Sequence, residues 1–288
     1  MSARVSAGLL GSGAISGYGI GTDALWAGLL GGQPGIGPMP LPLRAYTRCH
    51  AAAMVPATPE DGERPHHQRI SRATLLALAA AQEAARAAPD GVAPERIGLV
   101  LGTGLGNLDL IDEALRQEGA RLSPALAFQS YAHAAACEIS RALGTQGPLL
   151  TVSTGCNSGA DAIGIALDWL RLDKCDLVYA GGTEAELVPA FLQAMGAARA
   201  LQSRHNDTPC AASRPFDAAR DGNVPGEGAA FLLLAQPDVA RGRPVEAWLR
   251  GAACRAFGTR PPYDPFRPVP DIRNRPTAAI PALPPSVC

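Results

Sequence analysis

The stretch from residue 147 to residue 182 places the strongest constraint on the fold of this chain. "GPLLTVSTG" (147–155) is apolar and β-branched, "GADAIGIALDWLRLDK" (159–174) has a helical pattern, and "CDLVYAGG" (175–182) is a second apolar run. A strand, a helix and a strand of these lengths are typical of a parallel crossover unit. In such a unit the helix brings the chain back to the end of the sheet where the first strand began, so that the second strand runs parallel to it. The sequence therefore predicts an α/β architecture with a mostly parallel central sheet.

The same alternation continues on both sides of this unit. Further strands are predicted at 4–13, 96–104, 228–236 and 245–257, the last two as antiparallel neighbours, and further helices at 22–32, 71–88, 108–119, 123–144 and 188–199. The run "RIGLVLGTG" (96–104) is continuously apolar, as in a strand buried on both faces. Ser71 is expected to cap the helix behind it. Residues 33–68 carry many prolines and few periodic apolar residues, which predicts an irregular excursion.

Two glycine clusters, "GSGAISG" (11–17) and "GTGLG" (102–106), each follow a predicted strand. A dinucleotide-binding fingerprint needs a helix that opens directly on the glycines and an acidic residue about twenty positions later. Neither cluster meets both conditions. We therefore interpret them as tight turns where backbone packs closely against backbone.

Cys156 is the residue whose surroundings most suggest chemistry. The strand ends at a Gly that allows a sharp turn, and small residues follow Cys156 where the next helix begins. A cysteine there lies near unpaired N–H groups and the positive end of the helix dipole, which stabilise a thiolate. Its own N–H would point near an oxyanion formed on an attached acyl group. An inert buried cysteine remains the alternative on these local grounds, because such residues are common.

A thiol nucleophile usually works with a base, and the histidines are the natural candidates. None of them has a spacing that ties it to Cys156; they are His50, His66, His67, His133 and His205.

Composition excludes several classes of function. The formal net charge of -1 gives no attraction to nucleic acid or to anionic membranes. The longest apolar stretch, "GAAFLLLA", is far too short for a membrane span. The 7 cysteines lack the paired spacings of a disulfide framework or a zinc site, so we expect a cytoplasmic protein without a metal.

Three blocks together resemble the β-ketoacyl synthases, the condensing enzymes of the thiolase-like superfamily. They are "TVSTGCNSGADAIGIAL", "DLVYAGGTEAELVPAFLQAMGAARALQ" and "HNDTPCAASRPFDAARDGNVPGEGAAFLLL", in the order and spacing of that family. The resemblance runs from about residue 4 to about residue 270. It implies the N-terminal half of a thiolase-like α-β-α-β-α sandwich with a mostly parallel mixed sheet.

The resemblance also implies an acyltransferase of fatty acid or polyketide biosynthesis. Cys156 would take an acyl chain as a thioester, and decarboxylation of a malonyl thioester would then drive condensation. The loop that carries Gly104 and Leu108 would line the acyl pocket, as would Met195, which stands where the family often has an aromatic residue. No cofactor or metal is implied. The implied partners are an acyl carrier protein carrying acyl and malonyl thioesters and a second ketosynthase chain, in a homodimer or heterodimer, with 147–153 near the twofold axis.

The chain departs from the family pattern toward its end. Residues 1–257 resemble the N-terminal domain, and 258–288 begin like the C-terminal domain, with Asp264 at a recurrent Asp, before turning into a proline-rich segment expected to be disordered. Motifs like HGTGT and GFGG are absent from these residues, so the two His and the Lys of the family site are missing. We expect a C-terminally truncated chain with impaired condensation. A non-catalytic partner subunit resembling a chain-length factor and a cysteine hydrolase are the alternatives; Cys156 argues against the first, and the histidine spacing does not support the second.

Overall fold

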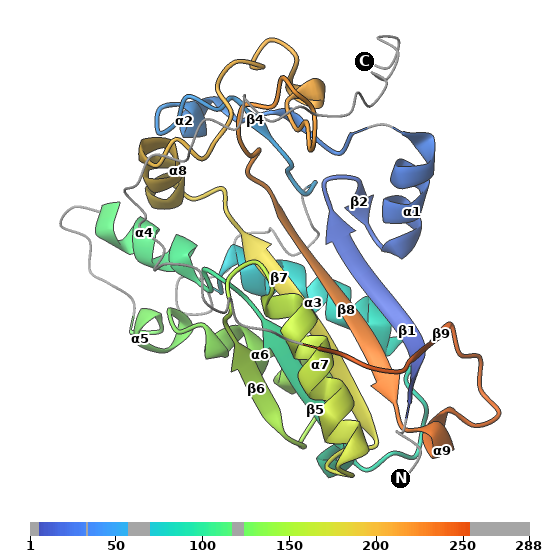
Figure 1. Cartoon of the computed structure of the whole chain (residues 1–288). Helices are drawn as coiled ribbons and strands as arrows, with labels where there is room; N and C mark the ends of the chain where they lie inside the picture. Colours follow the sequence, from blue (N-terminus) through green and yellow to red (C-terminus); the bar gives the residue numbers. More distant parts are fainter. Residues whose placement is uncertain (1–5, 33, 57–69, 117–123, 254–288) are drawn as a thin grey trace, which may run out of the picture.

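The computed structural model describes residues 6–32, 34–56, 70–116 and 124–253. A seven-stranded sheet crosses this part of the chain in the order β2-β1-β8-β7-β5-β6, with β9 beside β1 (Figure 1). Its strands are β1 (Ala7–Ser16), β2 (Gly19–Ile20), β5 (Ile97–Gly102), β6 (Leu149–Val152), β7 (Leu177–Ala185), β8 (Glu227–Ala235) and β9 (Ala247–Leu249).

The sheet is mixed, and most of its length runs in one direction. β5 pairs in parallel with both β6 and β7. β8 is antiparallel to β7 and to β1, so β1 runs in the same direction as β7. Among the long strands only β8 opposes the others, and β5 lies between β6 and β7, as a crossover through the intervening helix allows. The predicted α/β fold with a mostly parallel mixed sheet is confirmed.

Helices cover both faces of the sheet. α3 (Arg72–Ala85) and α6 (His133–Leu143) pack on one face around Leu76, Leu99 and Phe231. α7 (Ser158–Arg171) packs on the other face over β5 and β7 (Figure 1). The described part of the chain thus contains three layers, a helical layer on each side of one sheet.

Small residues bring α3 close to β1. A Cβ on Gly13 would lie 2.0 Å from the carbonyl oxygen of Ala80, and a Cβ on Gly11 would lie 2.6 Å from the Cβ of Ala87. Side chains cannot fit at these distances, so the first glycine cluster serves close packing. It does so from inside β1, which continues through the residues that the sequence suggested as a turn. Ser71 caps α3 as predicted, since its Oγ accepts a hydrogen bond from the N–H of Thr74 at 3.0 Å.

The remaining elements are short or peripheral. They are α1 (Thr22–Gly31), β3 (Gly37–Pro38), α2 (Leu41–Arg44), β4 (Ala51–Ala52), α4 (Leu108–Arg116), α5 (Leu126–Gln129), α8 (Pro189–Ala197), α9 (Pro237–Ala240) and the 3-10 turns Pro94–Arg96 and Pro209–Ala211. The predicted excursion at 33–68 is therefore partly regular, because β3 and β4 pair within it. Residues 254–288, and with them Asp264 and the expected domain boundary, lie outside the described residues.

The predicted pairing of the last two strands is wrong. β9 pairs with the first residues of β1 and not with β8. The reason is topological: β8 already has β1 on one edge and β7 on the other, so neither edge can accept another strand.

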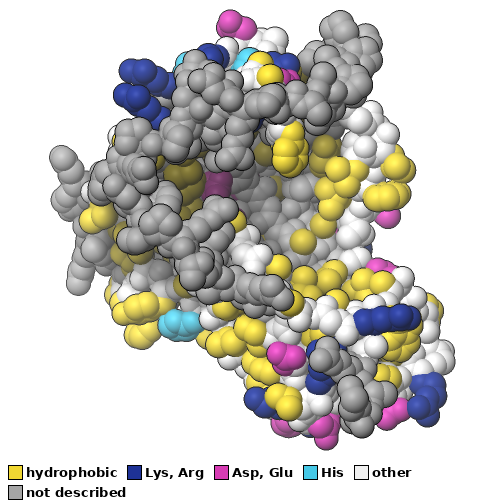
Figure 2. Space-filling view, viewed as in Figure 1, with side chains coloured by type: hydrophobic (Ala, Val, Ile, Leu, Met, Phe, Trp, Pro, Cys, Tyr) yellow, Lys and Arg dark blue, Asp and Glu magenta, His cyan; other side chains and the backbone are white. Residues whose placement is uncertain are grey.

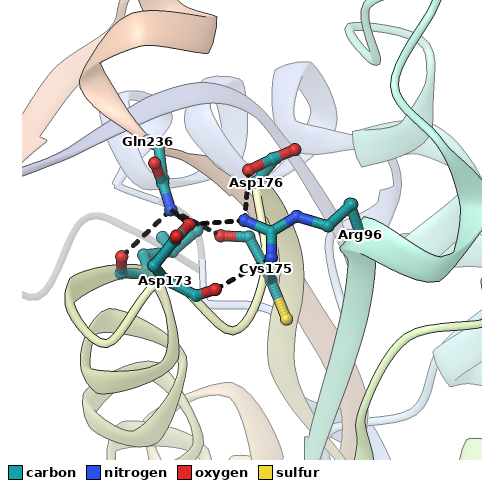
Figure 3. A network of polar contacts seen from close by, with 6 residues as sticks. Arg96, Asp173, Cys175, Asp176 and Gln236 are labelled. Atoms are coloured by element: carbon teal, nitrogen blue, oxygen red, sulfur yellow. Dashed lines mark hydrogen bonds and ion pairs between the residues drawn. The ribbon is translucent and has the colours of Figure 1, made fainter.

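A polar network fixes the end of α7 that lies farthest from Cys156 (Figure 3). The Arg96 guanidinium donates to Asp176 Oδ1 at 2.7 Å and to the carbonyl of Asp173 at 2.8 Å. Gln236 Nε2 donates to the carbonyl of Cys175 at 2.8 Å and to the Asp173 carboxylate. Hydrogen bonds from Gln236 and Arg96 lower the pKa of Asp173. The network joins the end of α7 to the starts of β5 and β7 and the end of β8.

Among the described residues, no helix is long and apolar enough to cross a membrane.

Candidate active site

Cys156 lies in the turn between β6 and α7. Gly155 before it adopts a φ of 66°, a left-handed conformation that glycine tolerates best. α7 begins at Ser158, one residue earlier than the sequence predicted, and Asn157 occupies the N-cap position. The Cys156 side chain is exposed and its thiol is free. The predicted placement of this cysteine at a helix start is therefore what the structure has.

Side chains of the first helical turn hold the turn that carries the cysteine. Ser158 Oγ donates to the carbonyl of Gly155 at 2.6 Å and accepts from the N–H of Thr154 at 2.9 Å. Asp161 accepts from Thr154 Oγ1 at 2.5 Å and from Asn157 Nδ2 at 3.1 Å. These bonds tie the residues before and after the cysteine to α7, so its position follows the position of the helix.

The cysteine opens into a cavity of about 710 Å³. The walls come from one end of the sheet: the ends of β1, β5 and β7, the start of β8, and the helices α1 and α8. Figure 2 shows a hollow in this face of the molecule with hydrophobic side chains around it. A crevice at the carboxyl ends of parallel strands is where α/β proteins generally bind ligands.

Glu184 fixes the loop that follows β5. Its carboxylate accepts hydrogen bonds from the N–H of Gly104 at 2.7 Å and the N–H of Leu105 at 3.1 Å. Gly104 and Leu105 both line the cavity. Leu108 is at the start of α4 and is not among the lining residues.

Met195 lines the cavity from α8, together with Phe191. α8 is anchored to α4, because Asp112 Oδ1 accepts from the N–H of Ala190 at 3.1 Å. Asp112 is itself held by Arg116 Nε at 2.6 Å. The cavity wall formed by α8 is thus positioned by a carboxylate on a neighbouring helix.

Glu186 is a lining residue that sequence reasoning missed. Burial raises the pKa of its carboxyl, and the charge of Glu184 raises it further, while a hydrogen bond from the N–H of Gly226 lowers it. Sequence reasoning also missed Glu184 and Asp161. For the two glutamates a signal was available: "GGTEAE" places polar residues at the end of an apolar strand, where sites in α/β proteins gather.

No histidine of the described chain lines the cavity. His133 stacks on Tyr131 with 5.5 Å between ring centroids, and His205 Nε2 contacts the carbonyl of Ala219 at 3.2 Å. His66 and His67 lie outside the described residues. Within that part of the chain there is also no group of three or more side chains that could bind a metal.

The other cysteines differ from Cys156 in their surroundings. Cys49 and Cys175 are buried free thiols, and burial raises the pKa of Cys175. Cys137 is an exposed free thiol on α6. Cys210 is disulfide-bonded, which the spacing of the cysteines did not predict.

Comparisons with known proteins agree with this geometry. Residues 9–240 match the family model of the β-ketoacyl synthase N-terminal domain. The tetracenomycin polyketide synthase ketoacyl synthase alpha subunit of Streptomyces glaucescens is 35% identical over 84% of this chain and 59% of its own length. The 3-oxoacyl-[acyl-carrier-protein] synthase 2 of Rhizobium meliloti (strain 1021) is 35% identical over 82% of this chain and 60% of its own length.

A solved structure, the ishigamide ketosynthase/chain length factor, matches this chain with a TM-score of 0.75 at 29% identity, covering 86% of this chain and 63% of that one. The chain thus spans about 60% of the length of the curated relatives it matches.

Proposed function

Because this chain belongs to the β-ketoacyl synthase family, we propose that Cys156 accepts an acyl chain from an acyl carrier protein in fatty acid or polyketide synthesis. The observation that carries the proposal is the position of the cysteine, exposed at the start of α7 and open to a cavity with apolar walls. Such a cavity is large enough for a ligand of the size that protein pockets usually hold.

The first step is a thioester exchange. The Cys156 thiolate attacks the carbonyl carbon of the incoming thioester, and the N–H of Cys156 stabilises the oxyanion that forms. A new carbon–sulfur bond to the enzyme is made as the bond to the carrier thiol breaks, and the carrier thiolate takes a proton from water. The acyl chain then lies along Phe191 and Met195, and Gly104 lies in the loop beside the sulfur.

The second step, condensation, needs more than these residues provide. Loss of carbon dioxide from a malonyl thioester leaves an enolate, whose carbon attacks the Cys156 thioester and releases the thiolate. Donors must stabilise the enolate oxygen. By resemblance they are two histidines in motifs that residues 1–288 do not contain. The 288-residue chain alone is therefore an acyl acceptor with little condensing activity.

Arginines on the other side of α8 support a carrier protein as the acyl donor. A cavity of about 750 Å³ there is lined by Arg48, Arg199 and Arg204. Arg204 pairs with Asp221 at 2.7 Å, whereas no acidic partner for Arg48 or Arg199 is present in the described ranges. Free guanidinium groups bind phosphate well, and the prosthetic arm of a carrier protein contains one.

The edge strand β6 supports a dimer. β6 ends the sheet, and Leu149 and Leu150 on it are each 38% exposed. An apolar edge strand usually pairs or is covered. A second ketosynthase chain on this edge, identical or not, would bring the turns that carry Cys156 near the dimer axis.

Release of the carrier thiol tests the proposal. The chain is mixed with octanoyl carrier protein, and free thiol is measured with and without Cys156→Ser. Wild type should release one thiol per active chain and Cys156→Ser none. Cys137→Ser, which removes the other exposed free thiol of the described residues, should behave as wild type. Arg199→Ala should slow transfer from the carrier but leave transfer from the short octanoyl-N-acetylcysteamine unchanged. Equal release by wild type and Cys156→Ser would contradict the proposal.

A non-catalytic partner subunit is the second candidate. The likeness to a ketosynthase/chain length factor structure favours it. Under this alternative Cys156 is present but is not acylated, and the thiol-release experiment separates the two.

A further inference from the structure

Four polar side chains besides Cys156 line its cavity: Ser16, Thr183, Glu184 and Glu186. Three of them already have partners in the protein. Thr183 Oγ1 donates to a backbone carbonyl at 2.7 Å, Ser16 Oγ accepts from an amide at 3.3 Å, and Glu184 accepts from two amides. For the Glu186 carboxylate, the described residues offer only the backbone N–H of Gly226. Glu186 is therefore the polar lining group with the most unused hydrogen-bonding capacity.

We propose that Glu186 determines the acyl specificity of this cavity: it favours chains that carry a hydroxyl group over plain alkyl chains and over chains that carry a carboxylate. The proposal rests on the role proposed for Cys156 as the acyl acceptor.

The preference for a hydroxyl follows from the unfilled acceptor sites of the Glu186 carboxyl group. A carboxyl group keeps acceptor sites in either protonation state, roughly four of them when it is ionised, so one amide leaves it largely unsatisfied. An alkyl chain in the cavity would remove water from Glu186 and give nothing in return. A hydroxyl on the chain donates to the carboxylate and replaces that water, and hydrogen bonds to charged groups are the stronger kind.

The rejection of anionic chains has the same origin. Glu184 is close enough to Glu186 for its charge to disfavour a second negative charge there. A carboxylate on the acyl chain would add a third. The other large side chains of the wall, among them Leu25, Phe191 and Met195, are apolar and suit the methylene groups of the chain. Figure 2 shows an acidic surface recessed within the central hollow, with hydrophobic side chains around it.

The test compares acylation rates of Cys156 by mass spectrometry in the 288-residue chain. The probes are N-acetylcysteamine thioesters of octanoate, of hydroxyoctanoates with the hydroxyl at each carbon from the third to the eighth, and of octanedioate. In wild type at least one hydroxyoctanoyl isomer should react about tenfold faster than octanoyl. Glu186→Leu should abolish this preference. Glu95→Leu is the matched control. It removes the same charge from an exposed site just before the start of β5, the end of the strand away from the cavity, and should leave the preference intact.

Glu186→Gln keeps the size of the side chain, so it disturbs the fold little and provides a second measurement. It should react severalfold faster than wild type with the octanedioate probe, because a charge has been removed. Absence of a hydroxyl preference in wild type, its survival in Glu186→Leu, or an unchanged octanedioate rate in Glu186→Gln would overturn the proposal. Failure of every probe to acylate Cys156 would instead overturn the acyl-acceptor role itself, and the octanoyl reaction of wild type against Cys156→Ser reports on that role alone.

Discussion

Replacement of Gly102 by alanine should displace the nucleophile without touching it. Gly102 ends β5, and a Cβ added there would lie 2.3 Å from the carbonyl carbon and oxygen of Ser158 and 2.5 Å from the nitrogen of Gly159. Ordinary contacts begin near 3.4 Å. The neighbours are backbone atoms of the first turn of α7 and cannot rotate away as a side chain can. Because packed interiors transmit such strain, relief of the clash requires the start of the helix to move by about 1 Å.

The movement has two measurable consequences. Overpacking of this kind destabilises a core by about 1–3 kcal/mol, so urea unfolding of Gly102→Ala should show that loss. Ser158 locks the turn that carries Cys156, so the sulfur moves with the helix. A misplacement of about 1 Å can lower a rate about a hundredfold. Single-turnover acylation by octanoyl-N-acetylcysteamine should therefore slow by about tenfold to a hundredfold.

Gly31→Ala is the matched control, because a Cβ at Gly31 meets nothing within 4 Å and its backbone is not left-handed. It should leave both the stability and the acylation rate close to those of wild type. Wild-type stability of Gly102→Ala would refute the packing argument. A loss of stability with an unchanged acylation rate would refute the claim that contact between β5 and α7 sets the position of Cys156.

Three further predictions concern an ion pair, the acid dependence of unfolding and decarboxylation. Glu227 is 6% exposed in its ion pair with Arg72, so Glu227→Gln should lower the free energy of unfolding by about 2–4 kcal/mol. Asp238→Asn, in the exposed pair with Arg241, should change it by less than about 1 kcal/mol. Urea titration measures both values, and equal effects would contradict the burial argument. Burial raises the pKa of Asp221, but hydrogen bonds from the N–H groups of Ser203 and Arg204 and the Arg204 charge outweigh it and leave the pKa lowered. A lowered carboxyl pKa gives stability that is present above the unfolded value near 3.9 and is lost as the pH falls through the folded value, so unfolding of Asp221→Asn should depend less on pH below about 4 than that of wild type, and parallel curves would contradict this. The 288-residue chain should release little carbon dioxide from radiolabelled malonyl carrier protein. Release at a rate comparable with its own acylation rate would contradict the proposal that residues 1–288 do not suffice for decarboxylation.

The architecture was largely predictable because its signals are local. The continuously apolar run at β5, the alanine-rich pattern of α3 and the Ser71 cap each follow from neighbouring residues. The partner of β9 was not predictable in the same way. It depends on which strand edges remain open once β1, β8 and β7 have assembled, and no short stretch of sequence contains that information.

The same distinction between local and long-range information applies to the residues of the candidate site. Cys156 was identified because a strand, a glycine and a helix start are adjacent in sequence. Glu186 was missed because its place in the site depends on a cavity whose walls come from residues between 14 and 230, far apart in the sequence. Leu108 was expected in that cavity by resemblance, whereas Leu105 lines it, since the hydrogen bonds of Glu184 turn the loop after β5 at Gly104 and Leu105.

The most direct measurement of the central claim is the site of the acyl group on the protein. The chain is incubated with octanoyl carrier protein, digested under conditions that preserve thioesters, and its peptides are sequenced by mass spectrometry. We predict one octanoyl group, on the peptide that contains Cys156, and none on the peptide that contains Cys137. An unmodified Cys156 peptide, or equal modification of Cys156 and Cys137, would contradict the assignment of Cys156 as the acyl acceptor.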